Sequence, residues 1–202
     1  MLINEITSYE NDEFCGEDLQ KMKLIEYIFV NCKFNFANLS ESELTNCVFS
    51  NCNFTSARLS DVSATKCEFS NCTFSDASLV GSTFSNCKAT GSSFVGAKLL
   101  GFSINGGNYS YTNFNYCNLK MMNFSNATFS NAFLQDCNLE KTKMRHTDLK
   151  GAVLNGSSLA GADIRGARIE SVDFKNVNLK KCLVDISQTI CIAECFGCIV
   201  QE

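Results

Sequence analysis

The chain has 202 residues, a formal net charge of −4 and no proline, and 45% of its residues are hydrophobic. A protein that holds nucleic acid through phosphate contacts needs an excess of lysine and arginine, so this composition argues against direct nucleic-acid binding. The length fits one domain with short ends.

Residues 1–11 form a predicted N-terminal lead-in. Asn4, Glu5 and Glu10 interrupt it, so it lacks the apolar core of a signal peptide. No later stretch is long and apolar enough to cross a membrane. We therefore expect a protein of the bacterial cytoplasm that has no membrane contact.

Residues 12–186 follow a five-residue repeat. Every fifth residue from Phe14 to Val184 is apolar, and most of these centres are Leu or Phe. A helix repeats its apolar face at about 3.6 residues and a strand at 2, so neither explains this period. The residue two places before each centre is almost always small between Cys32 and Cys182. We expect both positions to point into a core and the other three to face water.

A period of twenty residues is superimposed on the first. Leu recurs at every twentieth position from Leu19 to Leu179, and Phe does so from Phe14 to Phe114. Four pentads per coil would place these residues over one another at the strand spacing of about 4.8 Å. The sequence therefore predicts an all-β, quadrilateral parallel β-helix of about nine coils, in which each coil contacts its neighbours.

Most of the thirteen cysteines occupy the small inward position. Stacked cysteines would lie within disulfide range, and metal sites are a further alternative. In a reducing cytosol we interpret them as buried small apolar residues. The inward cysteines are Cys32, Cys47, Cys52, Cys67, Cys72, Cys87, Cys117, Cys137 and Cys182.

Residues 100–111 break the regularity. Phe102 is too large for an inward corner, Met122 repeats the exception one coil later, and Gly106-Gly107 adds flexibility. Either this face opens to accept two large side chains, or part of 100–111 leaves the coil as a loop, and we favour a bulge. The candidate partner-binding residues of this segment are Phe102, Ile104, Asn105, Tyr109 and Tyr111.

Residues 187–202 follow the end of the repeat near Asp185. They are apolar and begin with a short helix-compatible run. This run ends at Gly197, a natural helix stop. We expect this helical segment to cap the last coil and to bind a second copy of the chain. The predicted dimer interface consists of Ile190, Cys191, Ile192, Cys195, Phe196, Ile199 and Val200.

Few residues suggest chemistry. Cys191, Cys195 and Cys198 have the spacing of an iron–sulfur motif, but that spacing also places them on one face of a helix. His146, the only histidine, lies at an outward position beside Arg145, where no catalytic triad can be built. We expect no enzyme, no metal and no cofactor.

Acidic residues on the outside suggest how such a rod could imitate DNA. Glu41 and Asp61 stack in one outward column, and Asp76 is a further candidate. Strand dimensions give the rod a width of roughly 20–25 Å, close to that of a duplex. The alternative is that mixed surface charge only keeps the rod soluble.

The five-residue pattern resembles the pentapeptide-repeat family, whose fold is a right-handed quadrilateral β-helix. Residues 86–97 and 188–200 resemble, more specifically, the matching stretches of Qnr-type quinolone-resistance proteins. This resemblance implies a homodimer joined at its C-termini. It also implies a DNA mimic that binds DNA gyrase or topoisomerase IV and protects it from fluoroquinolones.

The same resemblance implies loops that protrude from the rod. The larger loop corresponds to residues 100–111, whereas the smaller one is missing because Cys47 runs to Phe54 without an insertion. The alternative function is a β-helical scaffold that binds some other protein.

Overall fold

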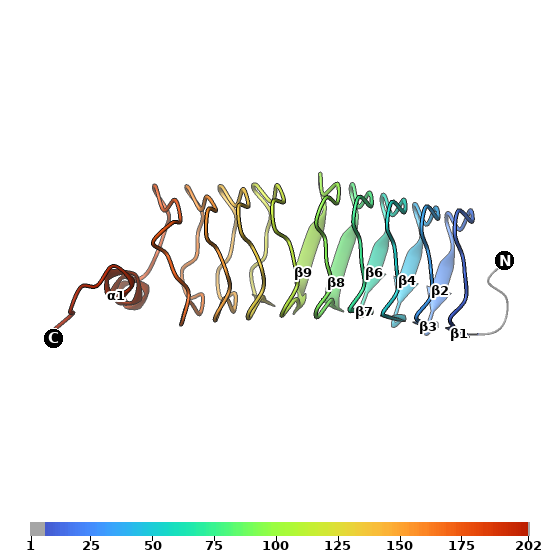
Figure 1. Cartoon of the computed structure of the whole chain (residues 1–202), viewed down its shortest axis with the longest axis horizontal. Helices are drawn as coiled ribbons and strands as arrows, with labels where there is room; N and C mark the ends of the chain where they lie inside the picture. The colour runs from blue at the N-terminus through green and yellow to red at the C-terminus, as the bar shows by residue number, and fades with distance from the viewer. Residues whose placement is uncertain (1–6, 202) are drawn as a thin grey trace.

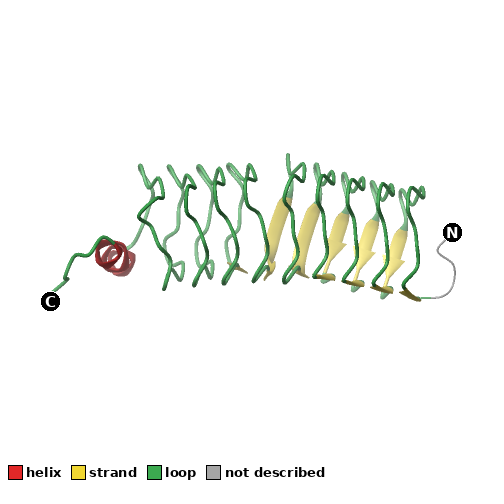
Figure 2. Ribbon diagram, viewed as in Figure 1, coloured by secondary structure: helices red, strands yellow, loops and turns green. Residues whose placement is uncertain are grey.

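A computed structural model describes residues 7–201 of the chain. The coils follow one another along a single rod, with β1 at one end and the C-terminal helix α1 at the other (Figure 1). Strand segments are concentrated in the N-terminal half (Figure 2). The elements are β1 (Ser8–Glu10), β2 (Lys23–Ile25), β3 (Ile28–Val30), β4 (Glu43–Thr45), β5 (Val48–Ser50), β6 (Ser63–Thr65), β7 (Glu68–Ser70), β8 (Thr83–Lys88), β9 (Ser103–Asn108), β10 (Ala127–Thr128) and α1 (Ile186–Cys195).

All pairing is parallel and joins residues twenty apart, which confirms the predicted β-helix with four pentads per coil. In the second half of the rod the pairing is reduced mainly to single bridges, such as Asn138 with Ser158. One unbroken column of nine paired residues runs along the rod, so the coils number about nine. Its members are Ser8, Ile28, Val48, Glu68, Lys88, Asn108, Thr128, Asp148 and Arg168.

The corners of the coils have left-handed backbone. Every fifth residue from Asn11 to Lys181, except Asn176, has a positive φ. Asn, Asp and Gly tolerate this conformation best, which explains why they are so frequent at these corners. The sequence pattern therefore encodes the turns as well as the core.

Apolar centres fill the interior in stacked columns. The rings of Phe34 and Phe54 are parallel with centroids 4.9 Å apart, and those of Phe94 and Phe114 are 4.5 Å apart. All four side chains are fully buried. Aromatic pairs at these separations contribute ~0.5–1.5 kcal/mol beyond the burial of their area.

The small inward residues also satisfy backbone carbonyls of the preceding coil. The Ser42 hydroxyl donates to the Leu19 carbonyl at 3.0 Å, and the Cys47 thiol donates to the Leu24 carbonyl at 3.3 Å. Burial raises the pKa of Cys32 to about 11 and that of Cys117 to about 12, so these thiols stay protonated. Apart from Cys182, the inward cysteines are hydrogen-bond donors as well as small residues, and all thirteen cysteines are free.

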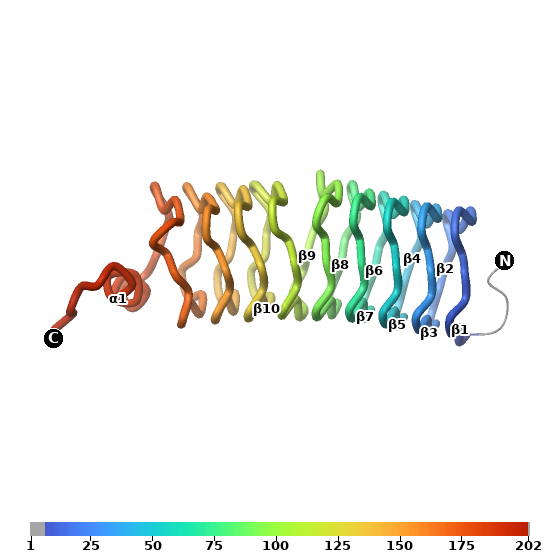
Figure 3. Tube along the Cα trace, in the orientation of Figure 1, coloured from blue at the N-terminus to red at the C-terminus, as the bar shows by residue number. Residues whose placement is uncertain are grey.

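Residues 100–111 stay in the coil, so of the two alternatives the protruding loop is not formed. Strand β9 pairs with β8 in register, with Ser103 opposite Thr83 and Asn108 opposite Lys88. The Cα trace follows the coil through this segment (Figure 3). The face opens instead, because Phe102 and Met122 are both buried at positions that elsewhere hold small side chains.

The ends of the repeat differ slightly from the expected boundaries. Strand β1 lies within the expected lead-in and pairs with β3, so the coils already include residues 8–10. Helix α1 begins at Ile186, one residue before the expected boundary. The part of the lead-in at residues 1–6 lies outside the described residues.

Candidate interaction surface

The acidic residues singled out in the sequence lie at exposed left-handed corners. Asp61 and Asp76 are at opposite edges of one face, and Glu41 precedes Asp61 in the same column. Arg58 and Lys98 lie between these edges, because both pair with Ser78 in one column. This face therefore has acidic edges and a basic middle, and is not uniformly negative.

Glycines make room for two of these carboxylates. A Cβ atom added at Gly96 would lie 2.7 Å from Oδ1 of Asp76, and one at Gly81 would be still closer to the Asp61 carboxylate. Each carboxylate is therefore folded along the rod over the corner of the next coil.

The predicted loop residues divide into two groups. Phe102, Ile104 and Tyr109 are buried in the core, so none of them can reach a partner directly. Asn105 is exposed on strand β9, and 57% of the Tyr111 side chain is exposed at a corner. Only these two of the five candidates face solvent.

Large apolar residues surround the middle of the rod on its outside. Tyr111, Tyr116 and Met121 occupy three successive left-handed corners and are 57%, 73% and 69% exposed. Phe133, 41% exposed, pairs with Asn113 on the face between the two tyrosines, and Leu100 is 80% exposed. We call these five residues (Leu100, Tyr111, Tyr116, Met121 and Phe133) the central apolar surface.

The central apolar surface lowers the stability of the isolated rod. A bulky residue in the left-handed region costs about 1–2 kcal/mol, and exposure removes the burial that would offset it. Tyrosine is enriched at the energetic centres of protein interfaces. Sequence reasoning overlooked Tyr116 and Met121, although each stands where the repeat otherwise favours Asn, Asp or Gly.

A cleft of about 800 Å³ lies between residues 97–103 and 118–123, and Leu100 and Met121 of the central apolar surface are part of its lining. Pairing runs from Ser78 to Lys98 and from Asn118 to Asn138, but within residues 7–201 no bridge joins Lys98 to Asn118. Phe102 and Met122, which lie next to each other in one column, line this cleft. Their size accounts for the separation of the two coils at this position, whereas the same coils still pair at Gly107 with Ala127 and at Asn108 with Thr128.

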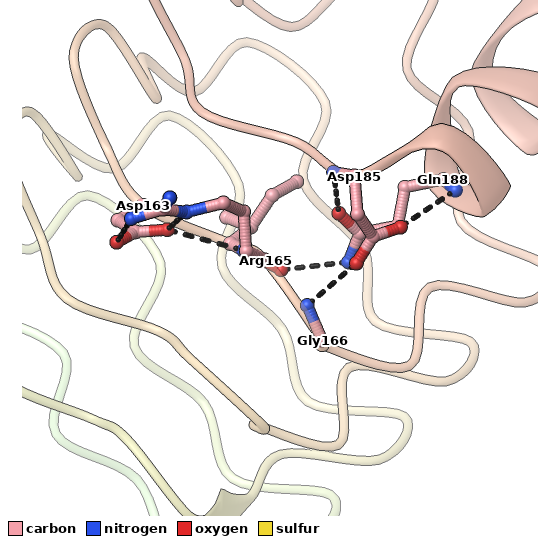
Figure 4. Close-up of polar contacts among 6 residues, drawn as sticks. Asp163, Arg165, Gly166, Asp185 and Gln188 are labelled. Carbon is pink, nitrogen blue, oxygen red and sulfur yellow. Dashed lines mark hydrogen bonds and ion pairs between the residues drawn. The ribbon is translucent and has the colours of Figure 1, made fainter.

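Helix α1 caps the last coils through hydrogen bonds (Figure 4). Gln188, almost fully buried, donates through Nε2 to the carbonyls of Ile164 and Ala167 at 2.6 and 2.8 Å. Asp185 accepts from the Gly166 amide at 2.8 Å, and this bond lowers the pKa of its carboxyl below the ordinary value. Asp185 and Gln188 also form a capping box for the helix.

The predicted dimer residues do not all face outward. Ile192 and Cys195 pack against the core of the rod, and the Cys195 sulfur accepts from the Phe174 amide at 3.2 Å. The remaining members are exposed and leave an apolar surface at the end of the rod. They are Ile190, Cys191, Phe196, Ile199 and Val200.

Of the residues considered for chemistry, Cys191 and Cys195 lie in helix α1, whereas Cys198 follows the helix. His146 is at an exposed corner, and the Cys195 thiol donates to the Asp173 carboxylate at 3.2 Å. Across residues 7–201, no three His, Cys, Asp or Glu side chains are grouped as metal ligands. The same residues include no helix long and apolar enough to cross a bilayer.

Comparison with known proteins agrees with this architecture. The family described as "Pentapeptide repeat region" matches residues 41–114 and 110–183. No curated protein matches the sequence significantly.

Solved structures of the same architecture include QnrB1, a plasmid-mediated fluoroquinolone resistance protein. Its trypsin-treated form is 23% identical, with a TM-score of 0.60, over 96% of this chain and 97% of that one. For full-length QnrB1 the TM-score is 0.58 at 23% identity, over 95% and 100% of the chains. HetL from the cyanobacterium Nostoc sp. strain PCC 7120 is 19% identical over 88% and 86%, with a TM-score of 0.48.

Proposed function

This chain belongs to the pentapeptide-repeat family, and from that premise we propose that it binds DNA gyrase or topoisomerase IV. The rod would occupy the surface that receives DNA and thereby protect the enzyme from fluoroquinolones. It acts by binding and not by catalysis, and we propose that it works in the bacterial cytoplasm as a homodimer joined at its C-terminal helices.

The rod shape, formed by coils that follow one another along one axis (Figure 1), is the observation that carries this proposal. About nine coils at the strand spacing of about 4.8 Å give a length near 40 Å, and the cross-section approximates a duplex. The QnrB1 structures, which have the same architecture, come from a fluoroquinolone resistance protein. The exposed apolar residues beyond Gln188 supply a contact surface for the homodimer.

The part of the rod that contacts the enzyme differs from what the resemblance implied. The larger loop that the resemblance implied at residues 100–111 does not protrude, because β9 stays in register with β8, and the smaller loop is already missing from the sequence. We therefore assign contact to the central apolar surface and the acidic corners at Glu41, Asp61 and Asp76. Tyrosine side chains at such positions bring large contact area with few rotatable bonds.

A supercoiling assay tests the proposal. Purified protein should restore the activity of gyrase or topoisomerase IV in the presence of ciprofloxacin. The double variant Tyr111→Asn, Tyr116→Asn should need at least about tenfold more protein, because a tyrosine at the energetic centre of an interface contributes about 2 kcal/mol or more. The matched control is Phe36→Asn, which changes an exposed aromatic corner far from the centre of the rod.

Two outcomes would count against this proposal. Absence of rescue at any concentration with both enzymes would remove the topoisomerase as partner. Equal rescue by the wild type and the double tyrosine variant would remove the central apolar surface as the contact. A different protein captured through the two tyrosines would favour the second candidate, a scaffold for another partner, since the exposed corners fit either role.

A further inference from the structure

We propose that the cleft between residues 97–103 and 118–123 binds an extended peptide segment, which pairs with the backbone of both walls and places an acidic side chain near Lys98. The argument for this site does not rest on the topoisomerase proposal, although Leu100 and Met121 of the central apolar surface also line the cleft. We infer it from backbone amides and carbonyls in the cleft that form no hydrogen bonds within the rod.

The two walls of the cleft are open strand edges. In the coils on either side the centres donate their amides to the next coil, as Leu79 does to the Lys98 carbonyl and Leu119 to the Asn138 carbonyl, both at 2.9 Å. Among residues 7–201 the amides of Leu99 and Gly101 have no hydrogen-bond acceptor. An unpaired strand edge is a template for the addition of another strand.

The opposite wall of the cleft has free carbonyl acceptors with the same two-residue spacing. Within the described chain, the carbonyls of Asn118 and Lys120 accept no hydrogen bond. The two amides on one wall and the two carbonyls on the other are each two residues apart, which is the repeat of an extended strand. An extended peptide could therefore accept from the first wall and donate to the second.

The side-chain environment defines the chemistry of the occupant. Leu99, Phe102 and Met122 line the cleft and are at most 9% exposed, so it favours apolar side chains. Lys120 is paired with Glu140 at 2.8 Å. Across residues 7–201 Lys98 has no carboxylate partner, and so an acidic side chain fits beside it.

The two large side chains that hold the cleft open, Phe102 and Met122, also indicate how to close it. Phe102 and Met122 follow Ser82 and precede Thr142 in one column. The Ser82 hydroxyl donates to the Leu59 carbonyl, and Thr142 donates to Leu139 at 2.8 Å. The double variant Phe102→Ser, Met122→Thr restores this column and should let the two coils pair.

Hydrogen exchange of the full-length protein gives the first measurement. The amides of Leu99 and Gly101 should exchange at least about a hundredfold faster than the paired amide of Leu119. In the double variant they should become protected. Protection of both amides in the free wild-type protein would overturn the proposal. This measurement uses only the wild type, so it does not depend on whether the double variant folds.

Peptide binding gives the second measurement. The probe is a blocked pentapeptide of alternating valine and aspartate, compared with the same peptide methylated on its backbone nitrogens. The unmethylated probe should bind saturably, protect Leu99 and Gly101, and bind at least about tenfold more weakly to Lys98→Glu. The methylated peptide and the double variant should give no binding.

Three outcomes would refute the peptide site. These are no saturable binding of the probe, equal binding of the two peptides, and binding without protection of the amides. Decanoate serves as a further probe, since it has an apolar chain and one carboxylate but no backbone amides. Saturable binding of decanoate without binding of the pentapeptide would assign the cleft to a small amphiphile instead.

Discussion

Replacement of Gln188 by alanine should detach helix α1 from the rod. The wild-type amide donates to the carbonyls of Ile164 and Ala167, and its oxygen accepts from the Asp185 amide at 3.0 Å. The variant loses three hydrogen bonds at a site where the side chain is only 3% exposed.

The expected cost follows from this count. A buried hydrogen bond contributes roughly 1 kcal/mol net, and carbonyls left unsatisfied raise the cost further. We expect Gln188→Ala to lower the free energy of unfolding by about 2–4 kcal/mol. Because coils contact only their neighbours, the loss should begin at the C-terminal end of the rod.

The assay is urea denaturation followed by circular dichroism, with hydrogen exchange to locate the change. The matched control is Thr189→Ala, which removes one exposed hydrogen bond to the Asp185 carbonyl in the same turn of the helix. The control should cost less than about 1 kcal/mol. Equal effects of the two variants, or unchanged exchange of the last coil, would refute the role assigned to Gln188.

Three further changes test other parts of the structure. Tyr109→Phe removes a buried hydroxyl that has no hydrogen-bond partner in the described chain, so it should stabilise the protein by about 1 kcal/mol and raise Tm by about 2–4 °C; a lower Tm would contradict this. Tyr111→Asn should also stabilise by about 1 kcal/mol, because asparagine tolerates the left-handed corner, and unfolding midpoints measure it. The Arg165 guanidinium lowers the pKa of Asp163 to about 2, so the stability that this pair contributes is present above about pH 4 and is lost as the pH falls through about 2. NMR titration should show that Arg165→Ala raises the Asp163 pKa toward its ordinary value, and an unchanged pKa would contradict the pairing.

Much of the fold could be predicted because the core repeats at fixed intervals. The spacing of Leu and Phe alone specifies four pentads per coil, and residues such as Leu44 and Ala64 do pair at twenty residues apart. The left-handed corners were not recognised, although the frequent Asn and Gly outside the core were their signal. The hydrogen bonds of the inward thiols also escaped notice, since small size explained those cysteines equally well.

The site was harder to predict because periodicity does not show how large side chains are accommodated. Phe102 could have been relieved by a loop or by separation of two coils, and both preserve the five-residue frame. Similarly, helix α1 is apolar on several sides. Buried Gln188 selects the side with Ile192 and Cys195 as the one that contacts the rod, and a pattern of apolar residues cannot show this.

The constant offset of twenty residues between paired positions makes this protein a molecular ruler. Duplication or removal of any twenty consecutive residues within the regular coils keeps every remaining residue in its column, and changes the length by one strand spacing of about 4.8 Å. Gene duplication can therefore adjust the reach of such a protein in fixed increments without redesign of its interior. A deletion of two or three residues has the opposite effect, since it would turn apolar centres toward solvent in all coils on one side of the cut.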